Sequence, residues 1–176
     1  RSVIRELFEF GKIRAAEIGA ENVFDFSIGN PSVPSPDIVN ETAMKLIQET
    51  DPVILHGYTS AQGDAHAREM IAASINRKFA TNYSADNLYL TVGAAAALCC
   101  CLHGICNAGD EVITFAPYFP EYKVFIEGAQ ATMKLIPADT QAFQIDFSAL
   151  EASFSEKTKA VIVNSPNNPS GAVYSE

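Results

Sequence analysis

Short apolar runs alternate with helix-like segments along the second half of the chain, and this alternation constrains the fold more than any other feature. The apolar runs are Asn87–Thr91, Glu111–Phe115, Ala131–Ile136 and Ala160–Val163. The helix-like segments between them cover 94–106, 121–127 and 146–154. Strands that are joined through helices cannot pair as hairpins, so they favour a mostly parallel sheet with helices on both faces. The sequence therefore predicts an α/β fold.

The first part of the chain lacks this alternation. Apolar residues at helical spacing predict an amphipathic helix over about 4–15. A second helix is predicted after a proline-rich stretch, with Ser35 as its N-cap and Pro36 in its first turn. We place a domain boundary near residue 50, which separates 1–50 from 51–176.

Composition excludes several classes of function. The net charge of −9 comes from 21 acidic and 12 basic residues, which argues against a nucleic-acid partner because such binding needs clustered Lys and Arg. No apolar run is long enough to cross a bilayer. The four cysteines and three histidines show neither zinc-ligand spacing nor a disulfide framework. The sequence predicts no metal and no membrane span, and the cysteines fit a reducing, cytoplasmic environment.

Polar and aromatic loops follow several of the predicted strands. Ser165-Pro-Asn-Asn-Pro-Ser-Gly171 offers two adjacent amides after the last strand, and Ala116–Tyr122 offers aromatic rings after an earlier one. Thr91-Val-Gly-Ala-Ala95 joins a strand to a helix, whose first N–H groups attract anions. Open α/β sheets bind ligands at the carboxyl ends of their strands, so these loops are the candidate binding site.

Ser165–Gly171 resembles the Asn-Pro-Ser/Thr-Gly signature of the class I aminotransferases, which use pyridoxal phosphate (PLP). His56–Gly63, followed by Arg68-Glu69, is similar to the Tyr-x4-Gly…Arg-Glu segment of the same family. The resemblance extends over essentially the whole chain. It implies the fold type I architecture, in which 51–176 is the first part of an incomplete large PLP-binding domain. Residues 1–50 are then an N-terminal arm and the start of a small domain.

The resemblance implies how the cofactor is held. Backbone N–H groups of Gly93, Ala94 and Ala95 bind the phosphate, although both alanines stand where the family commonly has hydroxyl residues. Phe119 stacks on the pyridine ring, with Tyr118 as the alternative if the register differs by one residue. An aromatic face suits a heteroaromatic cation.

The remaining implied contacts involve both cofactor and substrate. Asn168 bonds to the 3-hydroxyl oxygen of PLP and contacts the substrate carboxylate, because an amide donates without adding charge. The backbone N–H of Gly29, in Gly29-Asn-Pro31, meets the same carboxylate. Tyr58 reaches across a dimer interface to the partner's phosphate, so the resemblance implies a homodimer.

The residues of this chain that match the family's motifs do not include its catalytic residues. In the family, the Schiff-base lysine, the acidic partner of the pyridine nitrogen and the substrate-binding arginine all follow the asparagine motif. The lysine is therefore expected downstream, and the chain alone is predicted to be inactive. Ser153–Lys157 superficially resembles the family's Ser-x-Ser-Lys, but it has an extra residue and precedes the motif. Lys157 is interpreted as a surface lysine.

The leading hypothesis is an aminotransferase that moves an amino group between an amino acid and a 2-oxo acid, with aspartate favoured as the amino acid. One alternative is a PLP-dependent carbon–sulfur lyase, whose binding loops are nearly the same. Another is a non-catalytic or regulatory remnant of the fold. A nicotinamide-binding domain is excluded because no Gly-x-Gly-x-x-Gly follows a first strand.

Overall fold

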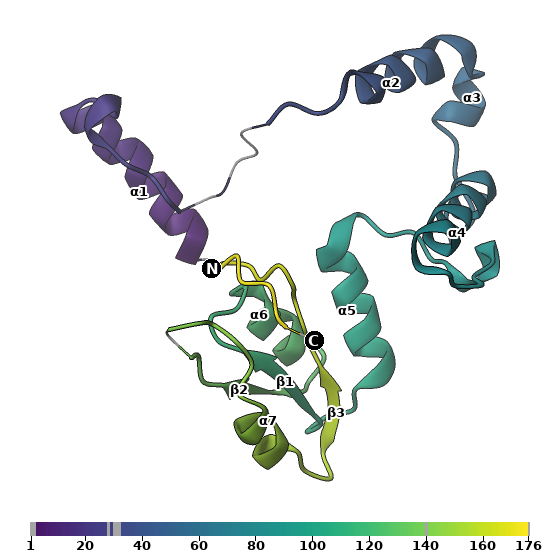
Figure 1. The fold of residues 1–176 in the computed structure, drawn as a ribbon. Helices are drawn as coiled ribbons and strands as arrows, with labels where there is room; N and C mark the ends of the chain where they lie inside the picture. Colours follow the sequence, from purple (N-terminus) through teal and green to yellow (C-terminus); the bar gives the residue numbers. More distant parts are fainter. Residues whose placement is uncertain (1–2, 28, 30–32, 140, 176) are drawn as a thin grey trace. The chain divides into compact units, whose positions relative to one another are not determined.

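The computed structural model describes residues 3–27, 29, 33–139 and 141–175, and Figure 1 shows its elements along the chain. The chain divides into two compact units, Arg1–Tyr58 and Thr59–Glu176. Each unit is described by itself. The second carries the sheet and most of the predicted binding loops.

The first unit is helical in its described part. Its elements are α1 (Val3–Ile18), the 3-10 turn η1 (Ala20–Asn22), α2 (Asp37–Glu49) and α3 (Pro52–Leu55). The carboxylate of Asp51 caps α3 by accepting from the backbone nitrogens of Val53 at 2.8 Å and Ile54 at 3.3 Å. The predicted Ser35 cap of α2 is wrong. Pro36 holds the N-cap position with ψ near 142°, outside the helical region, so the helix begins one residue later.

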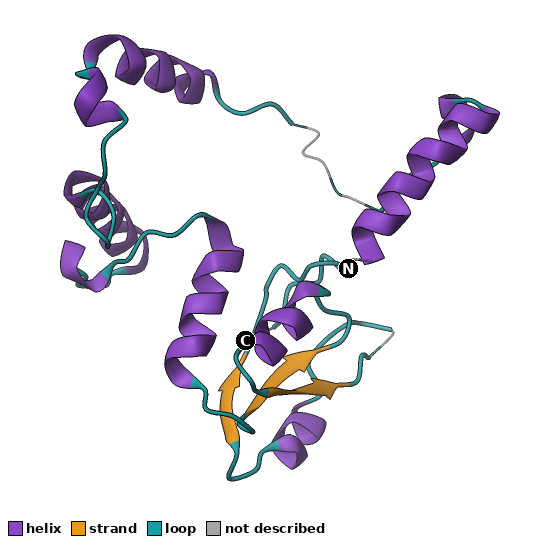
Figure 2. Cartoon of the chain, turned by 180° about the vertical axis from the view of Figure 1, so that it is seen from behind, coloured by secondary structure: helices purple, strands orange, loops and turns teal. Residues whose placement is uncertain are grey.

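The second unit is built on a parallel sheet. Its strands are β1 (Glu111–Phe115), β2 (Thr132–Ile136) and β3 (Thr158–Val161), in the order β2-β1-β3. The central strand β1 pairs in parallel with both neighbours, in register from Glu111 opposite Thr132 on one side. Figure 2 shows all three arrows pointing the same way. The predicted parallel sheet is confirmed.

Helices cover both faces of this sheet. The helical elements are α4 (Ala65–Phe79), η2 (Ala85–Asn87), α5 (Gly93–Ile105), α6 (Glu121–Gly128) and α7 (Phe147–Ser153). Val112 packs with residues of α5 and α6, whereas its neighbour Ile113 packs with residues of α7. Adjacent strand residues point to opposite faces, so these two clusters lie on the two sides of the sheet. The α/β fold class predicted from the sequence is correct.

One predicted strand is wrong. Residues 88–91 belong to no strand, and η2 occupies 85–87. The backbone nitrogen of Leu90 does find an acceptor, the carbonyl of Gln62 at 3.0 Å. A strand is defined by its ladder, and within the described residues this segment has no neighbouring strand to form one.

No helix in the described part of the chain combines the length and the apolar character needed to cross a membrane.

Candidate functional site

The loops that follow β1 and β3 lie at the same edge of the sheet. The two strands are adjacent and parallel, so their carboxyl ends meet. A side-chain hydrogen bond joins the loops directly: Nδ2 of Asn167 donates to the carbonyl of Pro117 at 2.9 Å. Both views of the chain show the amino end of α5 at this end of the unit as well (Figures 1 and 2). The second unit therefore joins the loops that carry Phe119 and Asn168 and has the amino end of α5 at the same end.

The loop after β3 is closed by its own backbone. Asn167 donates from its nitrogen to the carbonyl of Ala172 at 2.8 Å, and its carbonyl accepts from Gly171 at 2.7 Å. The turn needs a φ of +71° at Gly171, a conformation that favours glycine. Oδ1 of Asn164 accepts from the backbone nitrogen of Asn168 at 2.8 Å. The backbone of Asn168 is therefore fixed, while its side chain is exposed.

The loop after β1 presents two aromatic rings. Phe119 and Tyr118 are both half-buried and pack against the cluster formed with α5 and α6. The Phe119 ring lies edge-on to that of Tyr122, with centroids 5.6 Å apart and an interplanar angle of 80°. This contact leaves Phe119 in a defined orientation. It does not choose between Phe119 and Tyr118 as the ring that stacks on a cofactor.

Two tyrosines lie among the residues beneath these loops. The group comes from β1, the loops after β1 and β3, α6 and residue 174: Thr114, Phe115, Tyr118, Tyr122, Ile162, Asn164, Asn167 and Tyr174. Burial raises the pKa of Tyr122, and the nearby Tyr174 raises it further. Burial also raises the pKa of Tyr174. Both phenols therefore stay protonated at neutral pH and can donate hydrogen bonds.

The amino end of α5 suits an anion. Gly93 begins the helix with a φ of +79°, and the hydroxyl of Thr91 donates to its carbonyl at 3.0 Å. The N-cap residue, Val92, provides no side-chain acceptor. The backbone nitrogen of Gly93 donates to the carbonyl of Thr91 at 2.9 Å. Ala94 and Ala95 are exposed, so the N–H groups that the helix end can offer to a phosphate are those of the two alanines.

Two predicted residues belong to the first unit. Tyr58 is fully exposed, and Gly29 lies in irregular backbone. Its neighbours in the predicted motif, Asn30 and Pro31, lie outside the described residues. The roles of Tyr58 and Gly29 toward cofactor and substrate stay predictions.

Arg68 has a structural position within the second unit. Its side chain is buried, and its guanidinium donates to the carbonyls of Ala85 at 2.7 Å and Gly63 at 3.4 Å. It therefore ties the turn before α4 to η2.

Lys157 lies at the other end of the sheet from the loops. It precedes β3, and its carbonyl accepts from the backbone nitrogen of Glu111, the first residue of β1, at 2.8 Å. Its side chain is exposed. This position agrees with its interpretation as a surface lysine.

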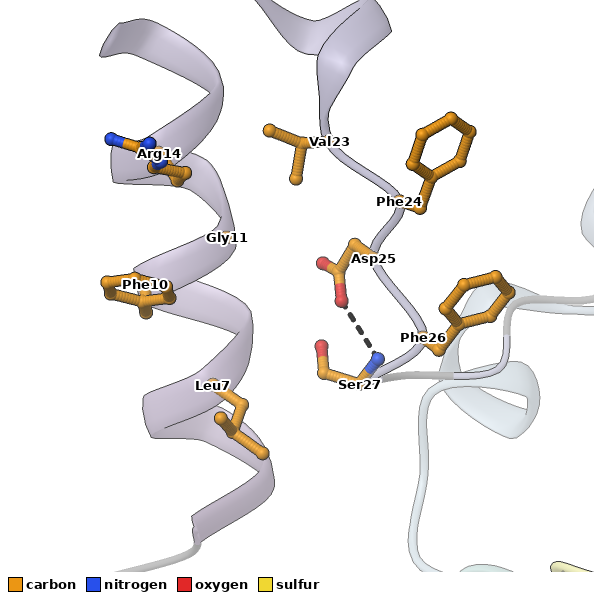
Figure 3. Close-up of a pocket in the computed structure, with 9 residues that line it drawn as sticks. All are labelled: Leu7, Phe10, Gly11, Arg14, Val23, Phe24, Asp25, Phe26 and Ser27. Carbon is orange, nitrogen blue, oxygen red and sulfur yellow. Dashed lines mark hydrogen bonds between the residues drawn. The ribbon is translucent and has the colours of Figure 1, made fainter. Parts of the chain in front are cut away.

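The first unit has a pocket of its own, of about 340 Å³, between α1 and residues 23–27. Figure 3 shows its lining, which is mostly apolar apart from Arg14, Asp25 and Ser27. The Asp25 carboxylate accepts from the Ser27 backbone at 2.8 Å, and hydrogen bonds from Ser27 lower the pKa of Asp25. None of the predicted site residues lines this pocket.

The sequence analysis missed the buried member of the asparagine pair. It assigned a role to Asn168, which is exposed, and none to Asn167, which is 6% exposed and bonds to a residue fifty positions away. The pair of adjacent asparagines was the only hint in the sequence that one of them could be buried. The neighbouring residues in the sequence do not show which amide faces a ligand and which one stabilises the loop.

Comparison with known proteins agrees with this fold and these loops. Residues 21–176 match the family described as Aminotransferase class I and II. The match spans most of the chain, so the chain belongs to this family.

Two relatives and one solved structure show how similar the chain is to individual proteins. The chain is 34% identical over 164 residues to an aspartate aminotransferase of Thermotoga maritima, across 93% of this chain and 42% of that protein. It is 30% identical over 168 residues to a probable aspartate/prephenate aminotransferase of Aquifex aeolicus, across 93% of this chain and 41% of that protein. The solved structure of an amino transferase from Eubacterium rectale is 59% identical with a TM-score of 0.93, across all of this chain and 44% of that one. The chain thus spans about two fifths of these relatives.

Proposed function

We propose that the protein carrying this chain is a PLP-dependent aminotransferase that transfers an amino group between an amino acid and a 2-oxo acid. The observation that carries the proposal is the joined pair of loops at the carboxyl edge of β1 and β3. They place an aromatic ring, Phe119, and an exposed amide, Asn168, on one bonded framework. Membership of the aminotransferase family supports the reaction class.

The residues present fit the cofactor. The uncapped amino end of α5 offers backbone N–H groups for a phosphate, and its glycine has the positive φ that brings the backbone close. Among the described residues, the carboxamide of Asn168 has no hydrogen-bond partner, so it is free to donate to a ring oxygen. When bound, PLP supplies an electron sink for reactions at the amino acid's α-carbon. The chain's own residues bind and orient it.

Aspartate is the proposed amino acid. Several relatives are named aspartate aminotransferase, while others carry names with further substrates. Side-chain selection needs groups that contact the substrate's far end. We propose that these groups, together with the Schiff-base lysine, lie in the part of the relatives that this chain does not span. The chain alone is then inactive.

Homodimer formation and a cytoplasmic location are further parts of the proposal. Tyr58 is fully exposed, as expected of a side chain that acts on a partner subunit. The cysteines are free thiols, which suits a reducing compartment.

The test uses the full-length protein. Borohydride reduction should add the mass of one reduced PLP per subunit, and aspartate with 2-oxoglutarate should yield oxaloacetate and glutamate. Cystathionine is the control substrate: its cleavage, without transamination of aspartate, would identify a carbon–sulfur lyase. A protein that acquires no PLP adduct would contradict the proposed function. The 176-residue chain, assayed in parallel, should show neither adduct nor turnover.

A further inference from the structure

Asn167 occupies an unusual position for a loop residue. Its side chain is buried. Among the described residues, Arg68 and Thr114 are the only other polar or charged residues that are buried. Burial of an amide costs free energy unless its hydrogen bonds are made. The NH2 group of Asn167 makes two such bonds, since Nδ2 donates to the carbonyl of Pro117 and to Oγ of Ser170, each at 2.9 Å.

The two bonds point to different parts of the site. Ser170 lies in the same loop as Asn167, so that bond closes the loop on itself. Pro117 lies in the loop after β1, two residues before Phe119, so that bond crosses between loops. Asn167 also precedes Asn168 directly. One NH2 group therefore links the loop that carries the aromatic ring to the residue that carries the exposed amide.

We propose that Asn167 is a positioning residue: its NH2 group holds the Phe119 loop and the Asn168 loop at a fixed separation, so that ring and amide meet the cofactor together. This inference rests on the proposed function. The side chain at position 167 must be a hydrogen-bond donor to bind the Pro117 loop, because Pro117 offers a carbonyl oxygen and has no N–H of its own. A carboxylate of the same shape would place oxygen against oxygen.

The chain offers two controls. Ser170→Ala removes the bond within the loop but leaves the bond to Pro117. Asn76→Asp repeats the asparagine-to-aspartate change at a loop clamp elsewhere in the second unit, where Nδ2 of Asn76 donates to the carbonyl of Tyr83 at 2.8 Å. Asn167→Asp removes both donors of the proposed link at nearly constant volume.

The first experiment needs no cofactor. Hydrogen exchange is measured on the full-length protein, freed of PLP, in peptides that cover 116–125 and 164–173. Asn167→Asp should accelerate exchange at least about ten-fold in both peptides, because an unpaired buried carbonyl loosens the β1 loop. Ser170→Ala should accelerate only 164–173, and Asn76→Asp neither. Unchanged exchange of 116–125 in Asn167→Asp would overturn the inference.

The second experiment reads the geometry of the bound cofactor. Visible circular dichroism per bound PLP reports how rigidly the chromophore is oriented. Asn167→Asp should halve this signal and weaken PLP affinity about ten-fold, while Asn76→Asp should leave both within two-fold of the wild type. Because a protonated aspartate can donate, the dichroism of Asn167→Asp should recover as pH falls toward 5. A purely structural role predicts no such recovery, and its absence would overturn the inference.

The two proposals fail separately. If the wild-type protein does not bind PLP, the proposed function fails, and the exchange of 116–125 still decides whether Asn167 couples the loops. If PLP binds and Asn167→Asp leaves its dichroism and affinity unchanged, only the positioning role fails.

Discussion

Val112, Ile113 and Ile126 have no exposed surface in the second unit, whereas Phe24 and Phe26 of the first unit remain 82% and 92% exposed. Both units contain amphipathic helices, so periodicity alone does not explain the difference. In the second unit a sheet offers two faces, and α5, α6 and α7 each cover part of one. In the first unit, α2 buries none of its residues.

This contrast separates two ways of stabilising a helix. In the second unit, packing against the sheet stabilises the helices, and packing is the main source of helix stability in proteins. In the first unit, local interactions contribute more, such as the cap that Asp51 forms on α3. A cap contributes about 1 kcal/mol, less than the burial of one large apolar side chain at about 1.5–3 kcal/mol. The two units should therefore differ in stability.

Backbone exchange gives the largest expected effect. In the 176-residue chain, amides of β1 should exchange at least about a hundred-fold more slowly than those of α2, because strand amides open only with the core. Mass spectrometry of peptides from each element measures this directly. Equal protection of α2 would contradict the comparison, since it would require a packed face, and α2 has no buried residue.

Core truncation comes next. Ile113→Ala should lower the free energy of unfolding by about 2–5 kcal/mol, because it leaves a cavity between β1 and α7. Ile47→Ala on α2, where the side chain is 68% exposed, should change it by less than about 0.5 kcal/mol. Urea unfolding followed by circular dichroism supplies both values. Similar losses at the two positions would contradict the assigned burial.

Glycines with positive φ sharpen the comparison further. Gly93→Ala, at φ +79°, should cost about 1–2 kcal/mol because the left-handed conformation is strained for alanine. Gly19→Ala, at φ +90°, puts a similar strain on alanine, but the measured loss should be smaller, since a loosely packed turn can open locally and release the strain. Hydrogen-exchange rates, measured separately for peptides of each unit, give the loss of stability caused by each substitution. An equal cost at Gly19 would show that the first unit is as rigid as the second.

Ion pairs give the smallest effect. Lys134 Nζ lies 2.9 Å from Glu111 in the second unit, and Lys45 lies 3.8 Å from Glu49 in the first. A hydrogen bond from Ser155, and then Lys134, lower the pKa of Glu111. The folded pKa lies below the unfolded one, so this stabilisation is present above the ordinary glutamate pKa of about 4.3. It is lost as pH falls through the folded value.

Glu111→Gln should therefore be less stable than the wild type at pH 7, with a difference that shrinks as the solution becomes acidic. Glu49→Gln, in an exposed pair, should follow the wild-type profile. Urea midpoints between pH 3 and pH 7 provide the readout. A constant difference across that range would argue against the Glu111 interaction.

Local sequence patterns predicted several elements correctly. The bounds of β1 match the prediction, and the helix-like segment predicted over 146–154 forms α7, whose N-cap is Asp146. Residues 87–91 show the limit of such patterns. Their alternation fits a strand, but a strand requires a neighbour, and nothing within the segment states whether one is present.

The site shows the same limit. Motifs located the three loops and placed an amide at Asn168. They could not show that Asn167 is the buried amide, because its partner Pro117 is distant in the sequence. The edge-on contact between Phe119 and Tyr122 is likewise set by the packing of α6.

The parallel order of the strands also has a practical use. The loops that carry Phe119 and Asn168 leave the carboxyl edge of the sheet, whereas short connections enter the strands at the amino edge. Ala108 is exposed in the turn between α5 and β1, at that opposite edge. A single cysteine introduced there, in a background freed of other reactive thiols, would anchor the protein to a sensor surface with its ligand-facing edge toward the solution.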